Sequence, residues 1–295
     1  MRAKIVAGLG FAAALGMAQP GLAAPDWKAV AQALGKPGTA MPDGVYRVGL
    51  PRSDLKVTLD GIEIKPAFAL GGWLAFQAAG NKDAMVMGDL VLTENEVNPV
   101  MKNLAASGIE ITGLHNHLLR ADPATMYMHV EGHGDAVKLA DSLHAALALS
   151  KTPFGALPSA KSETVDLDTA GIDDIMGSKG KMNGGVYQFT IPRADKITES
   201  GMPVPASMGT GIAINFEPLG GGKAAITGDF VLTSEEVNPV LRELREHGIE
   251  VTALHNHMLA DQPRLFFMHF WAHDDAASLA RELRSALDKT NLQHS

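Results

Sequence analysis

The chain has 295 residues, a formal net charge of −8 and no cysteine. Without cysteine the fold has no disulfide, and no thiolate can act as a nucleophile, a metal ligand or the lipid-carrying residue of a lipoprotein. The acidic charge and the lack of a basic segment exclude the usual charge pattern of a nucleic-acid-binding protein.

The N-terminal segment predicts export. Arg2 and Lys4 precede an apolar run over residues 5–17, and the small residues 21–24 offer a cleavage site, which we place after Ala23. The apolar run is shorter than the roughly 20 residues that span a bilayer. We therefore expect a signal peptide over residues 1–23 and a periplasmic or secreted mature protein without a membrane span.

The mature chain contains an internal duplication. Residues 84–147 align with residues 224–287 without a gap, and half of the aligned positions are identical. Upstream, VYRVGLPRSD (45–54) matches VYQFTIPRAD (186–195). Copies of this length exceed solenoid units. We expect a first repeat over 24–150, a linker over 151–167 and a second repeat over 168–295.

Within each copy the pattern predicts strands followed by a helix, two further strands and a last helix. In the second copy the strands are expected at 186–192, 212–217 and 224–232, with a loop or hairpin at 199–211. Thr233 to Glu236 form a capping box, whereas Asn238-Pro239 is also a good helix start. We expect a first turn, a kink, and a main helix from Pro239 to Gly248.

Strands are then predicted at 249–259 and 265–272 and an amphipathic helix at 275–287. In the first copy, an apolar turn is expected before Gly35 and its counterpart before Gly177. The fold class is thus α+β, with two tandem copies that each hold a mainly antiparallel sheet and two helices, either as separate domains or as one pseudo-symmetric body.

Eight of the eleven histidines occupy matched positions in the two copies. Each copy reads HNH, eleven residues, H, three residues, H, and the residues are His115, His117, His129 and His133, then His255, His257, His269 and His273. Alternation along a strand places the first two of each set on one face, and the last two likewise. If the two strands pair, four imidazoles per copy meet, which suits a transition metal, zinc first, with copper or iron as alternatives.

The acidic residues near these motifs admit several roles. Asp122 and Asp261 could complete a ligand set or act as a base, although they do not align between copies. Asp89 and Asp229 each follow a glycine, and we interpret them as bulge or turn residues. Glu131 stands where the second copy has Trp271, which predicts two inequivalent sites.

The string GDFVLTSEEVNPVLRELREHGIEVTALHNHML (228–259), followed by PRLFFMHFWAHDDAASLARELRSAL (263–287), resembles the LppY/LpqO family of bacterial exported proteins. The resemblance covers both copies and rests chiefly on the HNH tripeptide and the MHxxxH strand. It implies export and a duplicated domain, with no established activity. Lipoproteins occur in that family, and this chain lacks their cysteine.

Two functional hypotheses follow. The first is an exported envelope protein that binds a transition metal through the repeated histidines, with metal-dependent hydrolysis if a coordination position stays open. The alternative is a non-enzymatic module that binds a small molecule or envelope component, with structural or pH-responsive histidines. The sequence leaves open whether the protein is an enzyme.

Overall fold

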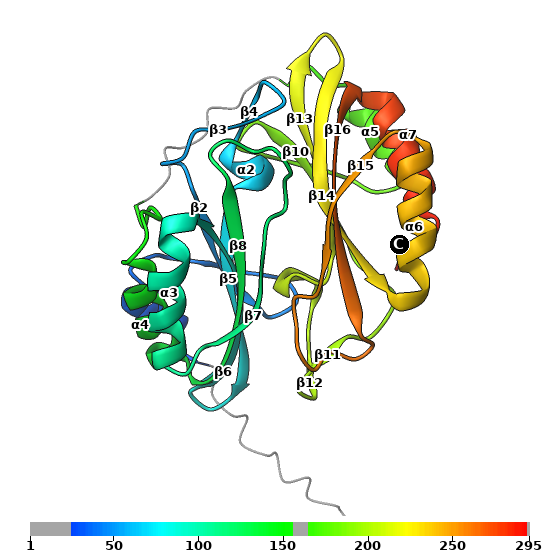
Figure 1. The fold of residues 1–295 in the computed structure, drawn as a ribbon. Helices are drawn as coiled ribbons and strands as arrows, with labels where there is room; N and C mark the ends of the chain where they lie inside the picture. Colours follow the sequence, from blue (N-terminus) through cyan, green and yellow to red (C-terminus); the bar gives the residue numbers. More distant parts are fainter. Residues whose placement is uncertain (1–24, 156–164, 294–295) are drawn as a thin grey trace, which may run out of the picture.

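The computed structural model describes residues 25–155 and 165–293, so the predicted signal peptide and the middle of the predicted linker lie outside the described residues. The described chain forms four layers, in which two six-stranded sheets lie side by side and helices cover their outer faces (Figure 1). This arrangement confirms the predicted α+β class with two tandem, mainly antiparallel repeats.

The two sheets have the same topology. The strand order is β1-β2-β5-β6-β8-β7 in the first and β9-β10-β13-β14-β16-β15 in the second, with antiparallel neighbours throughout. The first sheet consists of β1 (Thr39–Ala40), β2 (Tyr46–Pro51), β5 (Gly71–Gly80), β6 (Asp83–Thr93), β7 (Glu110–His115) and β8 (Thr125–Asp135). The second consists of β9 (Lys181–Asn183), β10 (Val186–Ile191), β13 (Ile212–Gly220), β14 (Lys223–Thr233), β15 (Glu250–His255) and β16 (Leu265–Asp275).

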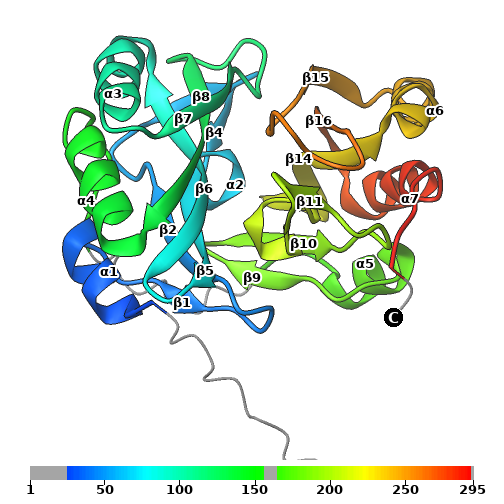
Figure 2. The ribbon, with the colours of Figure 1, turned by 90° about the horizontal axis from the view of Figure 1, so that it is seen from below.

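Three helices cover the outer face of each sheet, as the view from below shows (Figure 2). They are α1 (Trp27–Leu34), α3 (Glu94–Ala106) and α4 (Ala136–Leu147) on the first sheet, and α5 (Thr169–Met176), α6 (Ser234–Glu246) and α7 (Ala276–Leu287) on the second. Behind the first sheet they complete a core made of that repeat alone, whereas the core of the second repeat continues across to Val45, Ala75, Met85 and Met87 of the first.

A short arm from each repeat reaches toward the opposite sheet. In the first repeat the arm comprises β3 (Val57–Leu59), β4 (Ile62–Ile64) and α2 (Pro66–Ala69); in the second it comprises β11 (Thr198–Glu199), β12 (Met202–Pro203) and the 3-10 turn η1 (Ala206–Met208). The amides of Asn215 and Gln188 donate to carbonyl oxygens of α2 at 2.9 and 2.7 Å. These crossed arms make the two repeats one body.

Two local predictions were wrong. The segments before Gly35 and Gly177 are helices α1 and α5 rather than turns, each begun by an aspartate N-cap, Asp26 or Asp168, that accepts backbone N–H groups. Helix α6 starts at the capping box of Thr233 and Glu236 and continues through Pro239. The proline removes only one hydrogen bond, in the second turn, where Glu235 is exposed and its carbonyl can bind water.

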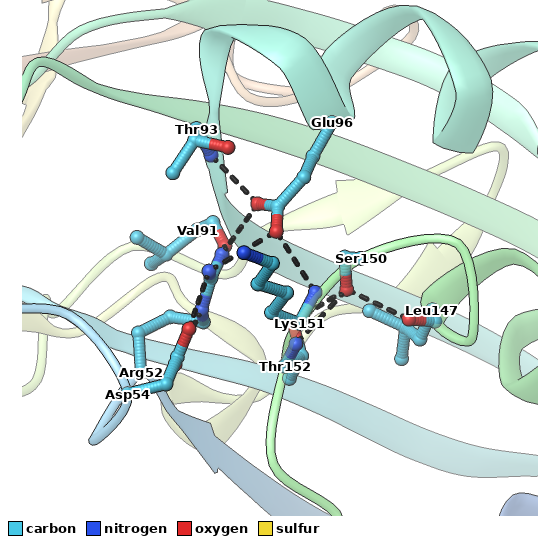
Figure 3. A network of polar contacts seen from close by, with 9 residues as sticks. All are labelled: Arg52, Asp54, Val91, Thr93, Glu96, Leu147, Ser150, Lys151 and Thr152. Atoms are coloured by element: carbon cyan, nitrogen blue, oxygen red, sulfur yellow. Dashed lines mark hydrogen bonds and ion pairs between the residues drawn. The ribbon is translucent and has the colours of Figure 1, made fainter.

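In the first repeat, a buried arginine joins a strand end, a helix start and the segment after the last helix (Figure 3). The side chain of Arg52 is fully buried and donates to Glu96 at 2.8 Å, to Asp54 and to the carbonyl of Val91. Glu96 also accepts the backbone N–H groups of Thr93 and Lys151 at 2.8 Å each. Burial alone would raise the pKa of Glu96, but these donors lower it.

The second repeat repeats this network with Arg193, Asp195 and Glu236, and Glu236 accepts the backbone N–H of Asn291. The PR(S/A)D motif and the capping-box glutamate thus fix a strand end, a helix start and the segment after the last helix at one point. An arginine suits this role because its planar group serves several acceptors at once.

Glu96→Ala should destabilise the protein by about 3 kcal/mol, because it leaves Arg52 buried without its main counter-ion and frees two backbone donors. Urea unfolding measures the change. Glu94→Ala is the matched control on an exposed position of the same helix and should shift the free energy of unfolding by less than about 0.5 kcal/mol. Equal stability of both variants would contradict the structural role.

Candidate metal centre

Six of the eight matched histidines meet between the two sheets. In the first repeat, His115 ends β7 and His129 lies in β8, and the antiparallel pairing of these strands sets Gly113 opposite His129. His117 follows two residues after the strand end. In the second repeat β15 and β16 place the corresponding residues in the same way. We call His115, His117 and His129 the first triad and His255, His257 and His269 the second triad.

The two triads are stacked face to face, ring on ring. His115 lies on His255, His117 on His269 and His129 on His257, with ring centres 3.4, 3.6 and 3.7 Å apart and interplanar angles of 25°, 19° and 24°. The pairing follows a pseudo-twofold axis, because each histidine of one repeat meets a histidine of the other. The sequence-based expectation of a separate site in each copy is therefore replaced by one shared centre.

Within each triad, two histidines share a possible ligand group with an aspartate: His117 and His129 with Asp89, and His257 and His269 with Asp229. The ring centres are 4.9 Å apart for His115–His117, 4.9 Å for His115–His129 and 6.3 Å for His117–His129. The second triad has the same 4.9 Å spacings around His255.

Two aspartates complete the centre. The ladder pairs Asp89 with His129 and Asp229 with His269, in continuous register, so the interpretation of these aspartates as bulge or turn residues was wrong. The Asp229 carboxylate lies 3.7 Å from Nε2 of His269 and 3.8 Å from Nε2 of His257. To find these aspartates from the sequence, one would need to know that residues 88–90 pair with residues 128–130. The sequence pattern does not specify this register.

The atoms that could ligate a metal face one another, and they have no hydrogen-bond partner among the residues that the structure describes. Nε2 of all six histidines and Oδ1 of both aspartates are buried and make no hydrogen bond. They fall into four overlapping groups whose candidate ligand atoms lie within 4.8 Å of one another. Buried polar atoms are almost always paired, and these eight unpaired atoms lie in groups that could hold a metal ion.

In three of the six histidines, the opposite ring nitrogen lies against a carbonyl oxygen. Nδ1 of His269 lies 2.9 Å from the carbonyl oxygen of Gly228, and Nδ1 of His115 and His255 lie 3.4 Å from those of Asn116 and Asn256. With Nδ1–H as the donor, Nε2 keeps its lone pair for a metal. A side chain at Gly228 would meet the carbonyl oxygen of Ala213 at 2.0 Å, so only glycine fits before Asp229.

Burial sets the protonation of the centre. It lowers the pKa of His115 to about 4 and that of His255 to about 3, and it lowers the pKa of the other four well below the ordinary value. Burial raises the pKa of Asp89 to about 7, with Arg47 opposing the rise, and it raises the pKa of Asp229, helped by the charge of Asp89. Neutral imidazoles are the form that ligates metals.

The structure does not bring His133 and His273 to the centre. His133 is 43% exposed, and its Nε2 lies 2.9 Å from the buried Glu131 carboxylate. His273 lies at an exposed position toward the end of β16. The strand β15 ends at His255 instead of continuing to residue 259, so His257 reaches the centre from the following loop.

The other acids have structural surroundings. Asp261 accepts the backbone N–H of Leu265 at 2.6 Å and pairs with Arg264, while the carbonyl of Asp122 accepts from Thr58. Trp271 donates to Asp60 of the other repeat at 3.0 Å, whereas the equivalent Glu131 is a buried carboxyl group beside His133. The two halves are therefore inequivalent in their surroundings.

The sequence profile of a domain of unknown function, DUF1259, matches the chain twice, over residues 28–149 and 170–289. The chain belongs to this family. No curated protein matches it significantly.

Two solved structures of shell proteins align with the chain. One is a trimeric bacterial microcompartment shell protein, PduB, with 10% identity and a TM-score of 0.20 over 85% of this chain and 90% of that one. The other is a double-ringed trimeric shell protein from the RMM microcompartment, with 10% identity and a TM-score of 0.18 over 71% and 84%. TM-scores this low carry no argument about fold or function. Among residues 25–155 and 165–293, no helix is both long and apolar enough to cross a membrane.

The metal-free protein should lose stability as the pH falls from 7.5 to 5. The six histidines have lowered folded pKa values, so only the unfolded state takes up their protons below about pH 6.5. The raised pKa values of Asp89 and Asp229 make the folded state more stable as the pH falls. Two aspartates act in this way against six histidines, so the net effect is a loss of stability. Thermal unfolding in a chelator at both pH values measures the effect, and His115→Gln with His255→Gln should reduce it. Equal stability at both pH values would contradict the burial of the triads.

Proposed function

We propose that this protein binds two transition metal ions at a single centre shared by its two repeats, and that the preferred metal is zinc. The observation that carries the proposal is the set of six buried Nε2 atoms and two carboxylate oxygens that face one another without partners. Imidazole with carboxylate suits zinc, copper or iron, while calcium and magnesium prefer oxygen-rich shells. These eight candidate ligand atoms also exceed the four ligands that a tetrahedral zinc ion binds.

The spacing of the triads supports a pair of ions. Each repeat supplies a group of one aspartate and two histidines, Asp89 with His117 and His129 and Asp229 with His257 and His269, and the rings of the two repeats are stacked with centres 3.4–3.7 Å apart. Metal ions in two-metal hydrolases lie about 3.5–4 Å apart, where together they activate water and bind the substrate's oxygens. We therefore infer hydrolysis as the activity of the loaded protein, with Asp89 and Asp229 placed to hold ligands or water in position.

The proposal places this protein outside the cytoplasm. It is supported by the signal-peptide pattern of residues 1–23 and by the resemblance to the exported LppY/LpqO proteins. The proposed ligand is a small molecule or a component of the cell envelope. The chain has no cysteine, so histidine and carboxylate side chains are its candidate ligands. A histidine site also suits an exported protein, because it needs no reduced sulfur.

The untagged protein should contain two equivalents of transition metal per chain by plasma mass spectrometry. His255→Ala with His257→Ala should remove at least one equivalent without unfolding the chain, since the helices and the outer cores are untouched. His133→Ala with His273→Ala is the matched control and should retain both. Full retention in the first variant would refute the centre.

A protein that binds neither native nor added zinc or copper would favour the rival hypothesis, a non-enzymatic binding module. Hydrolysis has its own test. Release of acid from a panel of small phosphate and carboxylate esters should stop after treatment with dipicolinate and return with added zinc. Bound metal without turnover of any ester would leave a binding protein rather than an enzyme.

A further inference from the structure

A very small cavity lies against one edge of the metal centre. His129 and His257, one histidine from each repeat, form part of its wall, and their rings are stacked with centres 3.7 Å apart. The cavity has a volume of about 10 Å³, which is room for about one water-sized sphere. An occupant of this cavity is therefore a single ion or a single water molecule.

Three methionines line the same cavity. Met87 lies in β6 of the first repeat, Met208 lies in η1 of the second, and Met258 directly follows His257. All three side chains are buried, with at most 5% of their surface exposed. Three thioethers and two imidazoles, from separate segments of both repeats, thus surround a space of the size of one ion.

Two of the methionines are absent from the duplicated pattern. The gap-free alignment of residues 84–147 with 224–287 sets Thr227 opposite Met87 and Leu118 opposite Met258. The histidines, in contrast, are present in both copies. The thioethers of Met87 and Met258 therefore give this edge of the centre a chemistry that the matched positions of the other copy do not have.

The wall of the cavity suits a soft ion better than a water molecule. A buried water molecule needs two to four polar partners, and a thioether sulfur is only a weak hydrogen-bond acceptor. Thioethers are, however, ligands that select Cu(I) among the transition metals. Burial keeps the two imidazoles neutral by lowering the pKa values of His129 and His257. A neutral wall favours an ion of low charge, because the cost of burying an ion rises with its charge.

We propose that this cavity is a binding site for one soft monovalent ion, Cu(I). Its candidate ligands are the thioethers of Met87, Met208 and Met258 and the imidazoles of His129 and His257. The inference rests on the proposed metal centre through these two histidines, and it adds a site with a different metal preference. Zinc in the centre and Cu(I) at its edge would compete for the two imidazoles.

Competition for Cu(I) between the full-length protein and the chelator bicinchoninate tests the proposal. Replacing the three methionines together, by Met87→Leu, Met208→Leu and Met258→Leu, should weaken Cu(I) binding by at least about tenfold. The zinc content should stay unchanged, because the thioethers are not zinc ligands in the proposed centre. Leucine has nearly the volume of methionine, so the variant should fold. Met208→Leu alone is the second variant if the triple variant folds poorly.

X-ray absorption at the copper edge gives a second measurement. The Cu(I)-loaded parent should show sulfur among the copper ligands, and the triple variant should not. Since the chain has no cysteine, any sulfur ligand from the protein is a methionine.

Met128→Leu with Met268→Leu is the matched control. These methionines are also fully buried, but each directly precedes a histidine of the centre on its strand, so their side chains point to the opposite face of the sheet. The control should keep the parent's affinity for Cu(I).

Cu(I) binding that is equally strong in the parent and the triple variant, or a copper shell without sulfur in the parent, would overturn the Cu(I) site and leave the zinc centre in place. A protein that binds zinc but no Cu(I) overturns the same site, with a water molecule as the occupant of the cavity. A chain that binds neither metal overturns the centre as well, so zinc analysis of the same samples separates the two failures.

Discussion

The burial of eight polar donor atoms at one point between two sheets is the constraint around which the rest of the structure is built. A buried polar group without a partner costs on the order of 1–3 kcal/mol, and the cost rises for carboxylates. Six imidazole nitrogens and two carboxylate oxygens therefore oppose the close approach of the sheets. Metal ions that bind these atoms would convert that cost into a stabilising contact between the repeats.

The sheets are held at this distance by contacts that do not involve the histidines. Hydrophobic cores lie between each sheet and its outer helices, the second continuing to residues of the first repeat, and the networks of Arg52 and Arg193 fix the strand ends and helix starts. The crossed arms then join the repeats through α2 and η1. Because the supports lie outside the centre, the donors can be preorganised before a metal binds.

Duplication gives the centre its pseudo-symmetry, and a few substitutions break that symmetry around it. Trp271 fills the space between the sheets and bonds to Asp60, where the first repeat has Glu131. Arg47 and Trp73 flank the Asp89 side alone. The set of possible metal ligands is thus preserved in both halves, while the residues around it differ.

Local patterns in the sequence were sufficient for the duplication, the order of strands and helices, the capping boxes and the histidines as the residues of interest. They depend on residues close in the chain, where spacing determines geometry. The register that sets Asp89 beside His129 was not accessible, and neither was the end of β15 at His255, which brings His257 in from a loop.

Only the tertiary structure decided that histidines of the two copies meet in shared groups and that His133 and His273 lie outside them. Each of these depends on how two sheets pack across more than a hundred residues of chain, and the spacing of residues along one strand carries no information about that distance.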